Sequence, residues 1–380
     1  MFKSKVYLVC ITCLIFAAIC NAEENNNLMN VYVGTYTKKT ESKGIYLFKM
    51  DQKTGQLNER AVAAEIENPS FVAVHPNRKF LYAVGEISGK SGVVSAFAID
   101  AETGKLKLLN QQTSGGAGPC HISIDKEGKK ALVANYVGGS IAVLPISHDG
   151  KLAEPSCVIV HKDPENNNKP RESHCHSINL DAYGKFAFVA DLGLDRVFFY
   201  KFDGTKGILT PNEPAALVLA AGSGPRHFVW HTSGKFAYII NELNSTMTVV
   251  SFDAEKGTLK ALQTLSTLPE GFTGKSYCAE VQVHPNGKFL YGSNRGHDSI
   301  AIYSIDEKTG LLKLSGFEPT QGSFPRNFGI DPEGQYLIAA NQKGNNLVMF
   351  KIDPSTGLIK PTGQKMDLPA PVCIKFFPAK

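Results

Sequence analysis

The sequence predicts an all-β fold, a seven-bladed β-propeller with four antiparallel strands in each blade. Three observations predict it: a phrase that recurs about every 50 residues, four short apolar segments in each repeat, and two chain ends that complete one another. A fixed period of this size is typical of solenoids, propellers and arrays. It outweighs the two or three domains that a length of 380 residues would suggest.

The recurring phrase begins with His or Asp and continues through a Gly-containing turn into an apolar strand. The copy at His284 reads HPNGKFLY. Related copies begin at His75, Asp125, Asp181, His231 and Asp331. A second phrase follows them, as in DAETGKL at Asp100 and DEKTGLL at Asp306. The Asn-Gly and Thr-Gly pairs indicate turns, because Gly tolerates the positive φ that such turns require.

Each repeat contains four apolar segments rich in Val, Ile, Phe and Tyr. In the copy at His284 we expect strands at 280–283, 289–293, 299–305 and 311–317. Four strands per repeat are typical of a propeller blade. No long segment has the 3.6-residue periodicity of an amphipathic helix, so we expect few helices.

The chain ends are expected to build the seventh blade together. Residues 31–35 resemble a second strand, and residues 372–378 resemble a first strand. Pairing them would close the ring and remove the two open strand edges.

The first residues have the pattern of a secretory signal peptide. Lys3 and Lys5 give a positive start, and the apolar stretch 6–19 is short for a membrane span. Ala22 offers a small residue at the cleavage point. We therefore predict that residues 1–22 are cleaved and that the protein is secreted or periplasmic, with no membrane span.

Lipidation of Cys20 is the weaker alternative, because Ile19 is a poor residue directly before a lipidated cysteine. We expect residues 23–30 to be a polar linker and residues 31–380 to be a single propeller domain. The net charge of +5 is dispersed and no basic run occurs, so nucleic acid is not an expected partner. The sequence leaves the oligomeric state open.

Cysteine usage indicates neither a disulfide framework nor a metal motif. Five cysteines remain after the predicted cleavage, and none of them belongs to a CxxC motif. His174 and His176 flank Cys175 on one strand, but no second ligand pair lies at metal-like spacing. We therefore predict no metal and no cofactor.

Equivalent positions of the repeats identify a candidate site. Five residues before each marker His or Asp, at the start of the innermost strand, stand Ser70, Cys120, His176, Arg226, Ala279 and Arg326, with Cys373 in the closing blade. Eleven residues after the marker, at the end of the second strand, stand Glu86, Tyr136, Leu192, Glu242, Arg295 and Gln342, with Tyr36 in the closing blade. Because these strands form an antiparallel hairpin, we expect both rings at one mouth of the central channel.

The position before the second ring is nearly constant and is predicted to be architectural. It holds Asn135, Asp191, Asn241, Asn294 and Asn341. The two rings vary and contain His, Arg and Glu, as a single asymmetric site requires. His121 and His227 follow the first ring by one residue, and we expect them to point into the packing between blades.

The arginines predict an anion-binding mouth. Arg226, Arg295 and Arg326 could hold a carboxylate or phosphate through planar, bidentate contacts. Lys275, in the insertion at 269–276, is a further candidate for contact with the anion.

The remaining polar residues predict hydrolysis. Glu242 could act as general base toward water, and His176 could act as base or acid near neutral pH. Arg226 or Arg295 could stabilise an oxyanion that develops at a carbonyl. The structural alternative is that Glu242 only bridges two blades by pairing with an arginine.

The phrases around these residues resemble the propeller-type lactonase family, which includes bacterial 6-phosphogluconolactonases and fungal carboxy-cis,cis-muconate lactonizing enzymes. The matching phrases are CHS at 175–177, GPRH at 224–227, NELNS at 241–245 and FPRNF at 324–328. The resemblance covers essentially the whole chain after the signal peptide. It implies a seven-bladed propeller without an obligatory metal.

The resemblance also implies which residues form the site. The lactonizing relatives use a His, an Arg, a Glu and a second Arg, and the sixteen-residue step from Arg226 to Glu242 matches their Arg–Glu pair. His176 and Arg295 stand at the natural positions for the other two, and Arg326 lies in a lactonase phrase.

The expected function is hydrolysis of a sugar-acid lactone, with a lactone or sugar acid as the small-molecule ligand. The signal peptide departs from the pattern, because the phosphogluconolactone reaction is cytoplasmic, so the lactone could differ. Two alternatives remain open: a cycloisomerase that forms lactones from unsaturated diacids, and a propeller that serves only as an interaction platform.

Overall fold

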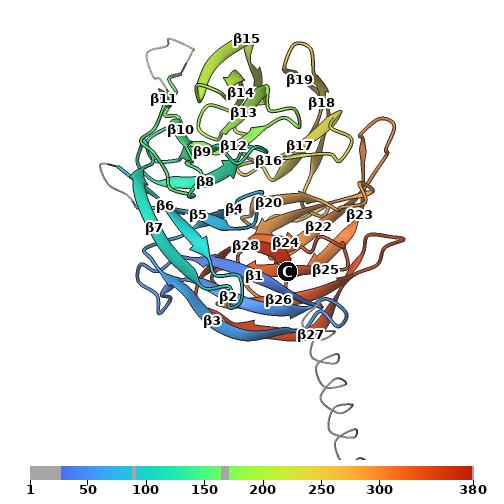
Figure 1. Cartoon of the computed structure of the whole chain (residues 1–380). Coiled ribbons are helices and arrows are strands. Elements are labelled where there is room, and N and C mark those ends of the chain that lie inside the picture. The colour runs from blue at the N-terminus through green and yellow to red at the C-terminus, as the bar shows by residue number, and fades with distance from the viewer. Residues whose placement is uncertain (1–26, 88–90, 164–170, 379–380) are drawn as a thin grey trace, which may run out of the picture.

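Seven four-stranded antiparallel sheets form a closed ring, which confirms the predicted seven-bladed propeller (Figure 1). The computed structural model describes residues 27–87, 91–163 and 171–378. These ranges contain strands and turns and no helix, and therefore no helix that could cross a membrane. The predicted signal peptide and residues 23–26 of the predicted linker lie outside the described residues.

The strands of each blade are given from the axis outward. The closing blade contains β28 (Pro371–Pro378), β1 (Leu28–Thr35), β2 (Gly44–Asp51) and β3 (Leu57–Glu65). The next two contain β4 (Phe71–Val74), β5 (Phe80–Gly85), β6 (Val93–Ile99) and β7 (Leu106–Thr113), then β8 (Pro119–Ile124), β9 (Lys130–Asn135), β10 (Ser140–Pro145) and β11 (Cys157–Val160).

The chain continues through two blades with long outer strands. They contain β12 (Cys175–Leu180), β13 (Phe186–Asp191), β14 (Arg196–Asp203) and β15 (Ile208–Val218), then β16 (Pro225–Trp230), β17 (Phe236–Asn241), β18 (Thr246–Asp253) and β19 (Thr258–Ser266). The last two contain β20 (Tyr277–Val283), β21 (Phe289–Arg295), β22 (Ser299–Ile305) and β23 (Leu312–Pro319), then β24 (Pro325–Ile330), β25 (Tyr336–Asn341), β26 (Asn346–Ile352) and β27 (Ile359–Asp367).

The two chain ends share one blade, as predicted. β1 pairs with β28 in antiparallel register, with Val33 opposite Ile374. β1 begins at Leu28 rather than at residue 31, because Met29 is fully buried and pairs with Met50 of β2. The last three residues of the predicted linker therefore belong to the propeller.

Marker residues of the repeat connect neighbouring blades. The imidazole of His75 donates from Nε2 to the carbonyl of Gly128 at 2.8 Å, and His231 and His284 make the same bond to the next blade. Gly128 has a φ of +70°, and a Cβ there would lie 2.2 Å from the His75 ring. The turn therefore requires glycine for both its backbone conformation and its space.

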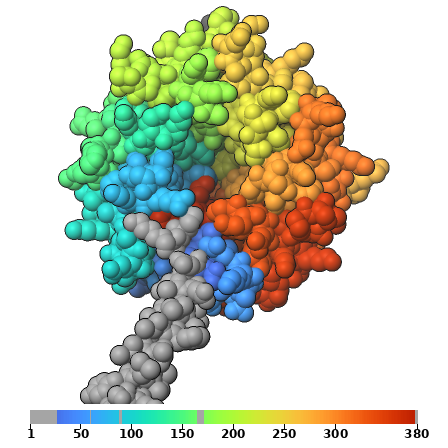
Figure 2. Space-filling view, turned by 45° about the vertical axis from the view of Figure 1, so that its right-hand side comes forward, coloured from blue at the N-terminus to red at the C-terminus, as the bar shows by residue number. Residues whose placement is uncertain are grey.

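The innermost strands of all seven blades surround the axis, where a space-filling view shows a hollow between the blades (Figure 2). Six of the seven residues of the second ring donate a backbone hydrogen bond to the segment that leads into the innermost strand of their own blade, and the seventh, Arg295, pairs with Tyr277 at the start of β20. Glu242 N, for example, donates to Gly224 O at 2.7 Å, and Tyr136 N donates to Gly118 O at 2.8 Å. Both rings therefore lie at the same mouth of the channel, as predicted.

Candidate active site

β-Bulges at the start of the innermost strands aim side chains at the axis. In β16, Pro225 pairs with Asn241 and His227 pairs with Ile240, so Arg226 is the extra residue of the bulge. The same shift occurs at the equivalent positions of β8, β12 and β24. A bulge rotates the strand locally, so two successive side chains can face one side.

The bulges overturn one prediction. His121 and His227 do not point into the packing between blades but line a cavity on the axis, and their ring centroids lie 5.6 Å apart. All seven innermost strands contribute to this cavity of about 570 Å³. The prediction assumed strict alternation of side chains, which a bulge interrupts.

The predicted arginines and glutamate meet at the mouth. Oε2 of Glu242 lies 2.9 Å from Nε of Arg226 and 2.8 Å from Nη2 of Arg295. Glu242 directly follows β17 in the same blade as Arg226, and Arg295 ends β21 of the next blade. The side chains of Arg226 and Arg295 are 3% and 5% exposed, whereas that of Glu242 is 17% exposed and reaches solvent.

Backbone carbonyls of β20 fix both guanidinium groups. Arg226 donates from Nη1 to Ala279 O at 2.7 Å. Arg295 donates from Nε to Tyr277 O at 3.1 Å and from Nη2 to Cys278 O at 3.1 Å. The cations are therefore held in place before any ligand arrives, which is the arrangement that electrostatic catalysis requires.

The positive charges of three neighbouring arginines keep the carboxyl group of Glu242 ionised. Burial raises the pKa of its carboxyl, but Arg295, Arg226 and Arg326 lower it more, so the pKa lies below its usual 4.5. The carboxylate is consequently unprotonated at neutral pH.

Arg326 belongs to a second polar group at the same mouth. Its Cζ lies 5.3 Å from the ring centroid of Tyr36, and Tyr36 donates to Oε2 of Glu86 at 2.9 Å. Burial raises the pKa of Tyr36, so its hydroxyl stays protonated. Tyr36 and Glu86 both stand in the second ring, but the sequence pattern alone assigns neither of them a role in the site.

His176 belongs to the first ring and is 4% exposed. Its ring makes edge contacts with the rings of Tyr136 and His227, each at 5.3 Å between centroids, and its Nδ1 lies 3.7 Å from Sγ of Cys120. Burial, then Arg226 and His227, hold the pKa of His176 well below its usual 6.5. It is therefore a neutral imidazole at physiological pH.

Lys275 is not joined to this cluster. It is exposed, its carbonyl lies against Gly296, and no ion pair or hydrogen bond among the described residues involves its side chain. A different lysine approaches the site: Lys343 Nζ lies 3.9 Å from the ring centroid of Phe324, and Arg295 Cζ lies 5.1 Å from the same centroid. Residues 164–170, which precede β12, lie outside the described residues.

The mouth also contains an unsatisfied donor. Oγ of Ser70 is buried without a hydrogen-bond partner among the described residues. It lines a space of about 10 Å³ beside Cys120, Arg226 and Arg326, roughly the size that one water needs. The larger cavity lies deeper along the axis, whereas the paired charges of Arg226, Glu242 and Arg295 lie at the mouth, where Glu242 reaches solvent.

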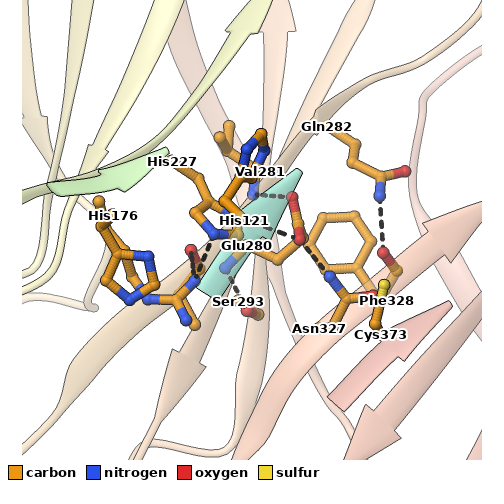
Figure 3. Close-up of polar contacts among 12 residues, drawn as sticks. His121, His176, His227, Glu280, Val281, Gln282, Ser293, Asn327, Phe328 and Cys373 are labelled. Carbon is orange, nitrogen blue, oxygen red and sulfur yellow. Dashed lines mark hydrogen bonds and ion pairs between the residues drawn. The ribbon is translucent and has the colours of Figure 1, made fainter. Parts of the chain in front are cut away.

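Below the mouth, a second carboxylate is buried among neutral partners (Figure 3). Oε2 of Glu280 lies 3.3 Å from Nδ1 of His227 and accepts a hydrogen bond from Nδ2 of Asn327, and Oε1 accepts from Val281 N at 3.1 Å. Burial raises the pKa of Glu280 above 4.5. The sequence contains a sign of this group of residues: His227, Glu280 and Asn327 each follow a residue of the first ring by one position, where side chains are expected to pack between blades.

Fold and side chains together define a seven-bladed β-propeller with a cluster of charges on its axis. The family model "Lactonase, 7-bladed beta-propeller" matches residues 30–376. The chain is 35% identical to the 6-phosphogluconolactonase of Bacillus subtilis over 345 residues, which cover 91% of this chain and 97% of that protein. It is 37% identical to the 6-phosphogluconolactonase of Formosa agariphila over 314 residues, covering 79% and 86%.

Two solved structures have the same fold. A putative 6-phosphogluconolactonase from Bacteroides fragilis is 36% identical, with a TM-score of 0.85 and coverage of 93% of this chain and 98% of that one. The periplasmic gluconolactonase of Pseudomonas aeruginosa is 30% identical, with a TM-score of 0.87 and coverage of 93% and 100%. The chain belongs to the seven-bladed β-propeller lactonase family and is a lactonase, an enzyme that hydrolyses a cyclic ester.

Proposed function

We propose that the protein hydrolyses the lactone of a sugar acid at the mouth formed by Arg226, Glu242 and Arg295. The observation that carries the proposal is a single carboxylate oxygen within 2.9 Å of two guanidinium groups from neighbouring blades. The names of the relatives, 6-phosphogluconolactonase and gluconolactonase, support a substrate of this class. The interaction-platform alternative required these charges to be dispersed, and these distances argue against it.

The arginines would bind the substrate before the reaction. Arg326 and Arg295 would receive an anionic group, because both are cations at the mouth and backbone carbonyls hold the guanidinium of Arg295 in place. An anion that binds to Arg295 would partly neutralise the positive charge that lowers the pKa of Glu242. Substrate binding would therefore make this carboxylate a stronger base.

Water activation would then follow. Glu242 would accept a proton from water while the water oxygen attacks the ring carbonyl carbon, and the Arg226 guanidinium would stabilise the resulting oxyanion. Collapse of the tetrahedral intermediate would break the bond between the acyl carbon and the ring oxygen. The proton held by Glu242 would return to the leaving alkoxide and yield the open sugar acid. Neutral His176 would hydrogen-bond to the substrate in the channel.

A substrate screen tests the proposal. Purified protein would be assayed on phosphorylated and unphosphorylated aldonolactones, with spontaneous hydrolysis subtracted, and on a muconate-type diacid. We expect acceleration of at least one aldonolactone and no reaction of the diacid. Turnover of the diacid alone would favour the cycloisomerase, and no turnover of any lactone would overturn the proposal.

Export is a further part of the proposal. Residues 1–22 have the composition of a signal peptide, and one relative is named a periplasmic enzyme. Expression of the full chain in a bacterium, followed by fractionation and N-terminal sequencing, should give an exported protein that begins at Glu23. An uncleaved cytoplasmic chain would contradict export without affecting the lactonase site.

A further inference from the structure

Three side chains with metal-binding atoms meet where two blades adjoin, outside the site described above. Nδ1 of His161 lies 2.8 Å from Oδ2 of Asp191, and Sγ of Cys175 lies 3.3 Å from Nδ1 and 3.7 Å from Oδ2. All three ligand atoms lie within 4.8 Å of one another. The side chains of His161 and Asp191 are 2% and 0% exposed, and Cys175 is fully buried.

The protein contains a neutral counterpart of this cluster two blades further along. His161 N donates to Gly139 O after the outermost strand of its blade, and Thr267 N makes the equivalent bond to Ser245 O. Asp191 and Asn294 occupy the same repeat position at the end of the second strand. Cys175 and Cys278 both directly precede a residue of the first ring.

In the counterpart, hydrogen bonds alone complete the contact between blades. Thr267 donates from Oγ1 to Oδ1 of Asn294 at 2.8 Å, and Nδ2 of Asn294 donates to Thr267 O at 2.6 Å. Asn135 and Asn341 make similar bonds to the carbonyls of Ser114 and Thr320. The fold therefore does not require His and Asp here. Among the residues that the structure describes, a thiol, an imidazole and a carboxylate meet at this contact alone.

Neighbouring groups orient the three candidate ligands. Tyr200 OH lies 2.9 Å from Nε2 of His161, which leaves Nδ1 directed at the cluster. Asp191 accepts at Oδ1 from the backbone N–H of His174 at 2.9 Å, and its Oδ2 faces His161 and Cys175 while also accepting a hydrogen bond from Oγ of Ser173 at 2.5 Å. Outer hydrogen bonds of this kind typically fix the ligands of metal sites.

We propose that Nδ1 of His161, Sγ of Cys175 and Oδ2 of Asp191 bind one Zn²⁺ ion. Thiolate, imidazole and carboxylate are the ligands that zinc takes in proteins, at about 2.0–2.3 Å. Ligand atoms at those distances around a tetrahedral centre lie roughly 3.3–3.8 Å apart by the same geometry, close to both separations that involve Sγ. Binding would release the thiol proton, and the imidazole proton between His161 and Asp191 would move to Nε2, where the Tyr200 hydroxyl oxygen would accept it, so that Nδ1 binds the ion as a neutral imidazole. Oγ of Ser173, 3.6 Å from Sγ, or water would complete the shell.

The proposed zinc site is not the His174 and His176 pair that the sequence spacing argues against. His174 bonds to Tyr136 O through Nδ1 and stacks on the Tyr136 ring, whereas His176 faces the channel, so these two histidines do not share a centre. Sequence spacing could not reveal the new set, because His161 follows β11 of one blade, whereas Cys175 and Asp191 pair across β12 and β13 of the next blade. The ion would connect two blades beside the strand that carries His176.

Metal titration of the chelator-treated, reduced full chain tests the proposal. We expect one Zn²⁺ per chain in competition with a chromophoric chelator, and a sulfur-to-metal charge-transfer band when Co²⁺ replaces it. The double variant His161→Thr with Asp191→Asn should lose this equivalent of Zn²⁺ and the Co²⁺ band. It should still fold, because it copies the set that the counterpart already uses.

Cys278→Ala is the matched control, because it removes the cysteine at the same position of the counterpart, and it should bind Zn²⁺ as the parent does. Failure of the parent to bind, a double variant that binds equally well, or a Co²⁺ spectrum without the sulfur band would each overturn the proposal. The Co²⁺ spectrum of the parent decides even if the double variant does not fold.

Discussion

Glu242 and Glu280 lie in two layers of the same axial channel, and they differ in almost every property that matters for chemistry. Glu242 contacts two guanidinium groups and has a lowered pKa, whereas Glu280 contacts His227, Asn327 and a backbone N–H and has a raised pKa. The side chain of Glu242 is 17% exposed and that of Glu280 is 8% exposed.

The two layers are connected through adjacent residues of one strand. Arg226 contacts Glu242 through Nε and lies 3.2 Å from Nε2 of His227 through Nη1, while Nδ1 of His227 faces Glu280. The bulge in β16 makes this possible, because both side chains reach the axis. Both carboxylates lie on the axis, so what separates them is charge pairing and access to solvent, and the proposed mechanism assigns water activation to Glu242 on those two grounds.

Arg295→Ala should have the largest effect on the mouth layer. It removes a cation that pairs with Glu242 and that we propose binds the substrate anion, so kcat/KM for the lactone should fall roughly a hundredfold or more. Loss of one partner of a buried pair should also destabilise the fold by about 3 kcal/mol. Steady-state kinetics and urea unfolding measure both. A folded variant with parental kcat/KM would remove Arg295 from the site.

The pH dependence of stability should have opposite signs in the two layers. The lowered pKa of Glu242 contributes stability above pH 4.5 that is lost as the pH falls through the folded-state value. The raised pKa of Glu280 has the opposite consequence: stability is greatest below 4.5 and declines as the pH rises through the folded-state value.

Urea unfolding of the parent, Glu242→Gln and Glu280→Gln between pH 4 and pH 8 would show these signs. Relative to Glu242→Gln, the parent should lose stability toward low pH. Relative to Glu280→Gln, it should lose stability as the pH rises. If the free energy of unfolding of the parent changed with pH in the same direction relative to both variants, the charged environment assigned to Glu242 and the neutral one assigned to Glu280 would be contradicted.

The fold was predictable because each blade repeats the same turn chemistry and strand pattern. The predicted strand at 299–305 matches β22, and the pairing of the two chain ends followed from their partial repeats. The meeting of Arg226, Glu242 and Arg295 was also predictable, because ring closure brings equivalent positions to one mouth.

Features of the site that depend on local backbone geometry or on contacts between blades could not be predicted from the sequence. The prediction that His121 and His227 point into the packing between blades was wrong, because bulges interrupt the alternation of side chains. The position of Lys343 against Phe324 was missed, because Phe324 adopts a left-handed backbone conformation with φ of 65° that spacing does not reveal. The cluster of His161, Cys175 and Asp191 forms only between blades.

The activity of the parent should show no inflection near pH 6.5. Burial and neighbouring cations hold the pKa values of His176 and His227 well below 6.5, so neither ring gains a proton between pH 6 and pH 8. We expect kcat/KM, corrected for spontaneous hydrolysis, to be flat over this range. An acid limb centred near 6.5 would show that one of these imidazoles has its ordinary pKa.

Replacing surface lysines should have the smallest effects on the kinetics of lactone hydrolysis. Lys343→Ala removes a cation next to Phe324 and should raise KM for an anionic lactone about two- to fivefold, the size of an exposed charge interaction. Lys275→Ala should change KM by less than about twofold, because its side chain has no contact with the cluster. A larger effect of Lys275→Ala would restore it as a substrate contact. Both measurements would be made at low ionic strength, where such contacts are strongest.

The most direct test compares Glu242→Gln with Glu280→Gln in one assay of lactone hydrolysis. Both variants replace a carboxylate on the axis by an amide of the same size. The proposed mechanism predicts that Glu242→Gln loses about 10²–10⁴ in kcat while still binding the sugar-acid product, and that Glu280→Gln stays within about threefold of the parent. Parental turnover by Glu242→Gln, or an equal loss in both variants, would contradict the assignment of water activation to Glu242.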